Sequence, residues 1–287
     1  MPRIAYVNGR YLPHAQAGVH VEDRGYQFAD GVYEVCEVAR GNVMDMTRHL
    51  DRLDRSLSEL RIAWPMTRRA LQTVMTEVVR RNRVTNGLVY VQVTRGVAPR
   101  DHYFPPESVR PSLVVTAKRT NSALLEKRAA EGVKVVTVPE NRWERVDIKT
   151  VGLLPNVLAR QQAKEAGAVE AWFVDRDGTV KEGAATNAWI VTQDGRLVTR
   201  PAEFGILRGV TRTTVIDVAA KLGLTVEERG FTVEEALRAK EAFLSAATTL
   251  VTPVVAIDGR PVGGGRPGEV ALSLRRAFFD VAEKTPA

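Results

Sequence analysis

The sequence "RVDIKTVGLLPNVLARQQAKEAG" (Arg145 to Gly167) sets a polar, charged entry directly before an apolar helical pattern. One lysine, Lys149, lies at the seam between the two. The letters "VDIKTVG" are typical of a strand end or a tight connection, where a side chain can point into a cleft. An amine held there can act as a nucleophile or a base, and its role depends on the groups around it.

The composition is that of a folded globular protein. Of the 287 residues, 44% are hydrophobic and 26% are charged, which allows a large buried core. The chain has no run of about 18 apolar residues, and the opening "MPRIAYVNGRYLP" lacks the apolar core of a secretory signal. Cys36 is the single cysteine, which excludes an internal disulfide and a cysteine metal cluster. We expect a soluble, cytoplasmic protein without a membrane segment or a metal site.

The charge is basic, with a formal net charge of +7 and a pI of about 9.7. Such a balance admits nucleic acid, an anionic membrane or anionic small molecules as partners. The arginines are scattered through helical patterns with acidic neighbours, and no helix-turn-helix or RNP-like aromatic motif accompanies them. We interpret most of them as solvated helix faces and expect no nucleic-acid partner.

The first part of the chain predicts two hairpins followed by two helices. Asn8-Gly9 in "IAYVNGRYL" is a favoured two-residue turn, and "VYEVCEVARGNVMDM" indicates a second hairpin. The helix "TRHLDRLDRSLSELRI", with Thr47 as its expected N-cap, places four leucines on one face: Leu50, Leu53, Leu57 and Leu60. Another helix and two strands follow. This pattern predicts a small α+β domain over residues 1–120.

The rest of the chain predicts a second, larger domain. After an interdomain connection at residues 121–132, apolar strands and helical patterns alternate from "VKVVTVP" to the closing helix "GEVALSLRRAFFDVAEK". The stretch "VKEGAATNAWIV" is expected to be one of these strands. We predict an α/β domain over residues 133–287.

Three segments of the second domain could bind a ligand. Glu182 opens "EGAATN", whose small residues make room for a flat ligand against the backbone. In "RGVTR", Gly209 and Thr211 stand at a helix start that can hold an anion, although an ordinary N-cap is the simpler interpretation of this segment alone. "SAATTLVTP" (Ser245 to Pro253) could donate further N–H and O–H groups.

Taken together, these groups match the needs of pyridoxal 5'-phosphate (PLP). The chain offers an amine nucleophile, an acid suited to a protonated ring nitrogen and a cluster of anion donors, but no metal-ligand set. PLP forms a Schiff base with a lysine, needs a carboxylate at its pyridine nitrogen and is anchored by its phosphate. From these residues alone, PLP is one of several ligands that fit.

The order of the motifs resembles the fold-type IV PLP-dependent aminotransferases. The resemblance runs through "YVNGRYLP", "HLDRL", "DIKT", "EGAATN", "GVTR" and "VTPVVAIDG", nearly the whole chain. It implies an α/β (α+β) two-domain fold, with a small N-terminal domain and a larger C-terminal pseudo-barrel. It also implies a Schiff-base role for Lys149, contact of Glu182 with the pyridine nitrogen, packing of Leu207 on the ring, and phosphate binding by Arg52, Val210, Thr211, Ala247 and Thr248.

Two of these assignments compete with other interpretations. Without the resemblance, Arg52 would be taken as a helix-surface ion pair with Asp51 or Asp54. The chain also departs from the family at Ala247, where a hydroxyl residue usually binds the phosphate. The backbone N–H of Ala247 can still donate a hydrogen bond, and Thr248 could supply the missing hydroxyl.

The loop "QVTRGVAPRDHYFP" (Gln92 to Pro105) separates the members of this class. Arg100 and His102 are two residues apart and could bind a carboxylate together. The pair resembles the α-carboxylate site of D-amino acid aminotransferases, which Tyr33 completes and which reaches across a homodimer interface. The resemblance implies transfer of the amino group between a D-amino acid such as D-alanine and a 2-oxo acid such as 2-oxoglutarate or pyruvate. A branched-chain L-amino acid aminotransferase and then an aminodeoxychorismate lyase are the alternatives.

Overall fold

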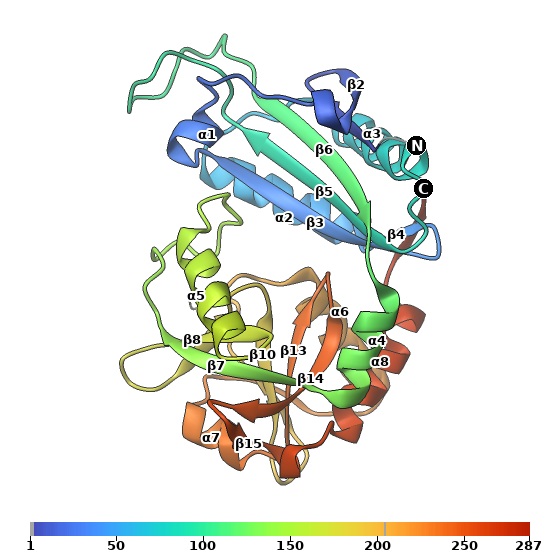
Figure 1. Ribbon diagram of the computed structural model, residues 1–287, viewed down its shortest axis with the longest axis vertical. Coiled ribbons are helices and arrows are strands. Elements are labelled where there is room, and N and C mark those ends of the chain that lie inside the picture. The colour runs from blue at the N-terminus through green and yellow to red at the C-terminus, as the bar shows by residue number, and fades with distance from the viewer. Residues whose placement is uncertain (1–2, 204) are drawn as a thin grey trace. The chain divides into compact units, whose positions relative to one another are not determined.

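The structure is a computed structural model that describes residues 3–203 and 205–287 (Figure 1). The chain divides into two compact units. The first unit contains Met1–Asn121, Ile148–Gly152 and Glu283–Ala287, and the second contains Ser122–Asp147 and Leu153–Ala282. The short segment around Lys149 therefore groups with the first unit. The domain boundaries at 120 and 133 stay a prediction, and the expected connection contains helix α4 (Ser122–Glu131).

The first unit contains an antiparallel sheet in the order β16-β4-β3-β5-β6-β1-β2. Its strands are β1 (Ile4–Val7), β2 (Arg10–Pro13), β3 (Gly31–Ala39), β4 (Asn42–Met44), β5 (Gly87–Thr94), β6 (Ser112–Arg119) and β16 (Lys284–Pro286). Both expected hairpins form. Asn8 and Gly9 have φ of 44° and 93°, and Arg40 and Gly41 have φ of 50° and 77°. Two consecutive positive φ angles are what a two-residue hairpin turn needs to follow the twist of its strands.

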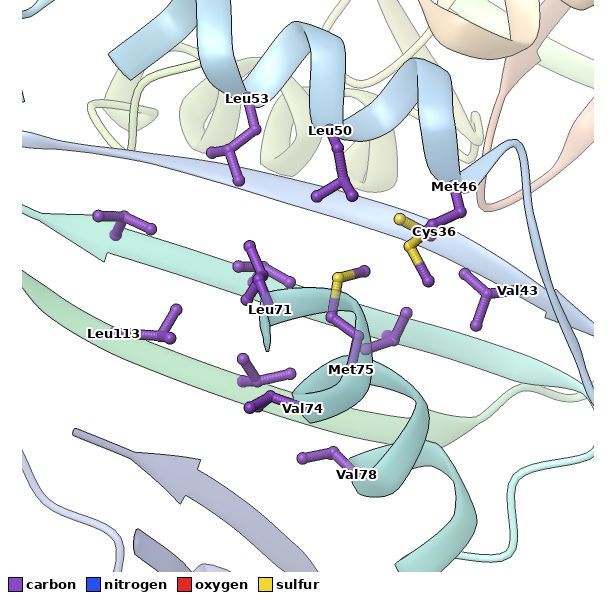
Figure 2. Close-up of a cluster of buried hydrophobic side chains, with 14 of the residues drawn as sticks. Cys36, Val43, Met46, Leu50, Leu53, Leu71, Val74, Met75, Val78 and Leu113 are labelled. Atoms are coloured by element: carbon purple, nitrogen blue, oxygen red, sulfur yellow. The ribbon is translucent and has the colours of Figure 1, made fainter. Parts of the chain in front are cut away.

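Helices α2 (Met46–Glu59) and α3 (Arg68–Arg81) contribute the apolar side chains that form the core of the first unit with the sheet (Figure 2). Leu50, Leu53 and Leu57 are buried as predicted. The expected N-cap is wrong: Asp45 precedes the helix, and Thr47 lies inside its first turn. The Glu283 side chain accepts hydrogen bonds from the Thr47 N–H and hydroxyl instead, a contact between residues 236 positions apart.

The second unit contains a larger sheet in the order β12-β11-β10-β13-β14-β7-β8-β9, with β15 beside β14. Its strands are β7 (Val133–Pro139), β8 (Glu170–Val174), β9 (Val180–Gly183), β10 (Asn187–Val191), β11 (Leu197–Thr199), β12 (Val226–Glu228), β13 (Glu241–Ala246), β14 (Leu250–Ile257) and β15 (Arg260–Pro261). Its further helices are α5 (Leu154–Glu165), α6 (Val210–Lys221), α7 (Val233–Arg238) and α8 (Glu269–Val281).

The segment expected to be one strand, "VKEGAATNAWIV", is two strands with a turn between them. The Gly183 N–H donates to the Thr186 carbonyl at 2.7 Å, which closes the turn between β9 and β10. A Cβ added at Gly183 would lie 2.1 Å from the Thr186 hydroxyl oxygen, so any larger residue would force the Thr186 side chain to move. The turn places Glu182 near the end of one strand and Asn187 at the start of the next.

The segment that carries Lys149 pairs with the edge of β3. Strand β4 covers only the far end of that edge, through Val38 and Ala39. At the near end, the Tyr33 N–H donates to the Lys149 carbonyl, and the Val151 N–H donates to the Gly31 carbonyl, each at 3.0 Å. The tight connection expected from "VDIKTVG" therefore extends the sheet of the first unit.

Candidate active site

Lys149 is fixed through its neighbours in the first unit. Ile148 is buried in the core, and the Lys149 N–H donates to the Ser56 hydroxyl at 3.4 Å. These backbone contacts direct the side chain to Tyr33, where Nζ lies 3.2 Å from the phenol oxygen and 4.3 Å from the ring centroid. Two residues predicted for the site, the candidate nucleophile and one candidate substrate residue, are thus in contact.

Tyr33 belongs to a row of aromatic and polar side chains on β3 and β5. Its ring centroid lies 5.6 Å from that of Tyr90, whose hydroxyl donates to Gln92 at 2.7 Å. Burial, followed by the neighbouring Tyr33, raises the pKa of Tyr90 to about 12, so Tyr90 stays a neutral donor. A cavity of about 310 Å³ is lined by residues that include Gln92, Thr94 and Val151, the last only two residues from Lys149.

Arg52 takes part in a buried charge cluster. Its Nε and Nη2 atoms each donate to the Glu34 carboxylate at 2.8 Å, and His49 Nδ1 lies 2.7 Å from the same carboxylate. The interpretation of Arg52 as a helix-surface ion pair is therefore wrong, because its partner is a buried acid on β3. Burial raises the pKa of Glu34, but the charge and hydrogen bonds of Arg52 and the contact with His49 outweigh it and hold the pKa at about 2.

Sequence reasoning missed Glu34 and His49. The signal was present in "VYEVCEV", because Glu34 has the same strand parity as the core residues Val32 and Cys36 and must point to the same face. An acid facing the core needs a cationic partner from the helices that cover it.

Arg100 and His102 gather around one aromatic ring in the first unit. The Arg100 guanidinium carbon lies 4.9 Å from the centroid of Phe28, and the His102 ring centroid lies 5.5 Å from it. Both side chains belong to exposed residues. The structure therefore brings this predicted pair together, while Tyr33 lies with Lys149.

Glu182 is the centre of a hydrogen-bond network in the second unit. Its carboxylate is buried and accepts from Arg142 Nη1 at 2.7 Å, from Asn187 Nδ2 at 3.1 Å and from the Leu207 N–H at 3.1 Å. Burial lowers the pKa of Arg142, but the hydrogen bonds and charges of Glu140 and Glu182 outweigh that effect and raise it. Sequence reasoning missed Arg142, because no local pattern marks a partner 40 residues away. It also missed Asn187, although this residue ends the "EGAATN" motif only five residues after Glu182.

The start of α6 presents backbone N–H groups that no side chain of the described residues caps. Gly209 is the N-cap residue, and Val210 and Thr211 are buried in the first turn. A Cβ at Gly209 would lie 2.0 Å from Asn187 Oδ1, so glycine is required by packing against the network that holds Glu182. Gly209 is an ordinary N-cap residue that has no side chain to cap the helix, so the first-turn N–H groups are suited to an anion.

The segment between β13 and β14 carries Ala247 and Thr248, both half-buried. The neighbouring Thr249 has a buried hydroxyl oxygen without a hydrogen-bond partner among the described residues. An unsatisfied buried hydroxyl is costly unless a ligand or water completes it. It is a further hydroxyl close to the position where Ala247 departs from the family pattern.

These groups fit PLP by the chemistry of their donors. The first unit supplies an amine at Lys149 and a guanidinium at Arg52, and the second supplies the acid of Glu182 and the uncapped start of α6. The described residues contain no group of three or more His, Cys, Asp or Glu side chains that could hold a metal. Nor, among the helices described, is any long and apolar enough to cross a membrane.

The buried Glu34–Arg52 pair predicts a specific dependence of stability on pH. Because the folded pKa of Glu34 is about 2, below its ordinary 4.5, the stabilisation is complete above pH 4.5 and is lost as the pH falls toward 2. Glu34→Gln should lower the free energy of unfolding at pH 7 by about 3–5 kcal/mol, since it leaves Arg52 buried without its anion. Urea unfolding should show that the difference from the native protein shrinks between pH 4.5 and 3.

Glu77→Gln is the matched control for this prediction. Glu77 pairs with Arg80 and Arg81 on the surface of α3, where solvent limits the loss to below about 1 kcal/mol. Equal effects of the two substitutions, or a Glu34→Gln difference that is the same at pH 7 and pH 3, would contradict the assignment.

Comparisons with known proteins give the family. The family model described as "Amino-transferase class IV" matches residues 31–257. The D-alanine aminotransferase of Bacillus licheniformis is 38% identical over 271 residues, which cover 94% of each chain. That of Staphylococcus haemolyticus is 38% identical over 273 residues, which cover 95% of each chain.

Solved structures agree with this assignment at the level of the fold. The branched-chain amino acid aminotransferase of Escherichia coli superposes with a TM-score of 0.90 at 25% identity, covering 98% of this chain and 95% of that one. The branched-chain amino acid aminotransferase of Thermoproteus uzoniensis, solved with norvaline, gives 0.84 at 27% identity, covering 98% of each chain. The predicted fold class is confirmed, and the chain belongs to the class IV aminotransferase family.

Proposed function

We propose that this protein is a PLP-dependent D-amino acid aminotransferase. It moves the amino group between a D-amino acid, such as D-alanine, and a 2-oxo acid, such as 2-oxoglutarate or pyruvate. The observation that carries the choice of D-amino acids is the 38% identity to D-alanine aminotransferases over almost the whole chain. The branched-chain enzymes with the same fold are only 25–28% identical. Fold similarity is shared by both activities and does not separate them.

In this proposal, each unit supplies part of the chemistry that the cofactor needs. When bound, PLP supplies an aldehyde carbon that takes the amino group and a ring that accepts electrons from the substrate Cα. Lys149 Nζ would hold the cofactor and would take the substrate Cα proton as general base. Tyr33 orients Nζ, since its phenol oxygen lies 3.2 Å away.

Glu182 keeps the pyridine nitrogen protonated. For this role the carboxylate must stay ionised although it is buried, and the charge of Arg142 at 2.7 Å stabilises the anion. Asn187 and the Leu207 N–H fix its direction. Leu207 would pack on the ring through its side chain.

The phosphate would be held by Arg52 and by the start of α6. The first-turn N–H groups at Val210 and Thr211 donate to the anion, and the positive end of the helix dipole adds to the attraction. The N–H of Ala247 and the hydroxyl of Thr248 complete this set. The hydroxyl of Thr249 can serve the same segment, because its oxygen is buried and unsatisfied among the described residues.

Arg100, His102 and Tyr33 would bind the α-carboxylate of both substrates. A guanidinium and an imidazole give charge-assisted hydrogen bonds to a carboxylate, and one such site serves both halves of a ping-pong cycle. As in the family, the loop would complete the site of a neighbouring subunit, which makes the protein a homodimer. A single cysteine that has no partner for an internal disulfide supports a cytoplasmic location, where thiols stay reduced.

Steady-state rates with different donors test this function. With 2-oxoglutarate as acceptor, D-alanine should yield pyruvate, which is measured with lactate dehydrogenase. The rate with L-leucine should be lower by at least about 100-fold, because a site built to bind one arrangement of polar groups discriminates to that extent. Lys149→Ala should abolish both reactions.

Two outcomes would favour the alternatives. Transamination of L-leucine without D-alanine would select the branched-chain activity, which the structural neighbours make the first rival. Pyruvate release from aminodeoxychorismate without an amino acceptor would select the lyase.

Complementation between variants tests the shared site. Mixed subunits of Arg100→Ala and Lys149→Ala should recover about a quarter of the native activity, because half of the dimers are mixed and each mixed dimer has one intact site. The matched control pairs Tyr33→Ala with Lys149→Ala. Tyr33 contacts Lys149 within one chain, so that mixture should recover nothing. Recovery in both mixtures, or in neither, would contradict a loop that reaches across the interface.

A further inference from the structure

Asp30 lies between two buried arginines in the first unit. Its carboxylate accepts from Arg24 Nε at 2.8 Å and from Arg95 Nε and Nη2 at 2.8 and 2.9 Å. Arg24 and Arg95 are only 4% and 8% exposed, so both charges depend on this anion. Burial raises the pKa of Asp30, but the hydrogen bonds and charges of the two arginines outweigh it and lower the pKa, so Asp30 is ionised at neutral pH.

Arg24 also contacts the loop that carries Arg100 and His102, the candidate carboxylate-binding pair. Its Nη1 donates to the carbonyl oxygen of Asp101 at 2.6 Å, the one residue between the two. The Arg24 guanidinium also lies 4.9 Å from the Phe28 centroid, the ring that Arg100 and His102 contact.

Arg95 fixes the same loop further along. Its guanidinium carbon lies 3.7 Å from the Phe104 centroid, and the Arg61 guanidinium contacts that ring at 4.7 Å. Arg95 also donates to the carbonyls of Leu60 at 2.7 Å and of Arg61 at 2.9 Å, just after α2. An otherwise exposed loop is thus tied to the buried part of its unit on both sides of His102.

We propose that Arg24, held by Asp30, is a positioning residue that fixes the backbone between Arg100 and His102 and so sets the affinity for the substrate carboxylate. The inference rests on the proposed function, because that function assigns carboxylate binding to Arg100 and His102. Two side chains on a mobile loop would lose conformational entropy when they bind a carboxylate. A loop that is already fixed loses less entropy on binding, so its affinity for the carboxylate is higher. The planar guanidinium donates to Asp30 through Nε and to the Asp101 carbonyl through Nη1, in two directions that its rigid geometry fixes.

A double-mutant cycle on the PLP-loaded protein tests this inference. The variants are Arg24→Gln, Arg100→Ala and the double variant. Stopped-flow mixing with D-alanine, followed by the visible absorption of the bound cofactor, gives an apparent Kd and a limiting rate. Arg24→Gln should raise the Kd by about tenfold or more and leave the limiting rate within about twofold, because it changes substrate binding more than the chemical step. In the Arg100→Ala background, the same substitution should raise the Kd by a smaller factor, because only His102 is left for Arg24 to position.

Two controls separate positioning from folding. Arg81→Gln also removes an arginine that has an ion pair and an aromatic contact in the first unit, to Glu77 and Tyr11, but it lies away from the loop and should leave the Kd unchanged. Arg24→Lys keeps a cation beside Asp30 and should show an intermediate Kd, and it replaces the glutamine variant if that protein does not fold. Hydrogen exchange of the amides in residues 99–103 should be faster in either Arg24 variant than in the native protein.

The outcomes distinguish the inference from the function on which it rests. An unchanged Kd in Arg24→Gln, or an equal rise in both backgrounds, overturns the positioning role while Arg100 keeps its own. An unchanged Kd in Arg100→Ala shows that the carboxylate pair itself is misassigned, and the role of Arg24 fails with it.

Discussion

The pairing of residues 149–151 with the near end of β3 is the constraint on which the candidate site depends. Two backbone hydrogen bonds, Tyr33 N–H to Lys149 and Val151 N–H to Gly31, hold a segment that would otherwise be an exposed connection. They are available because β4 leaves that part of the β3 edge open. The pairing puts the Lys149 amine against the Tyr33 phenol and positions it through the sheet, which is more rigid than a loop.

The charged residues that matter most to the proposed site form buried ion pairs. The first unit buries Glu34 with Arg52, and the second buries Glu182 with Arg142. In each case a long-range ion pair fixes a group that the proposed chemistry needs, a guanidinium for phosphate and a carboxylate for the pyridine nitrogen. Such fixed charges cost little reorganisation when a ligand binds.

The predictable parts of the structure are those encoded locally. The Asn8-Gly9 turn, the leucine face of α2 and the connection at Lys149 follow from neighbouring residues and appear as expected. The errors have two sources: Glu283, 236 positions away, binds the Thr47 N–H and hydroxyl, and a turn closed between Gly183 and Thr186 divides one expected strand into two. Arg142 was missed because a sequence does not show a partner 40 positions away, whereas Glu34 and Asn187 carried a local signal, in the strand parity of Glu34 and in the position of Asn187 at the end of "EGAATN". The resemblance to a family named candidate ligand-binding positions but not these supporting contacts.

Borohydride reduction of the PLP-loaded protein, followed by mass spectrometry of its peptides, tests whether Lys149 holds the cofactor. Reduction fixes a phosphopyridoxyl group permanently on the lysine that holds the cofactor. We expect the label on Lys149, and we expect that prior addition of D-alanine, without a 2-oxo acid, removes it, whereas L-leucine leaves it in place. A label on another lysine would contradict the site built around β3. A label on Lys149 that only L-leucine removes would keep the site and contradict the choice of D-amino acids.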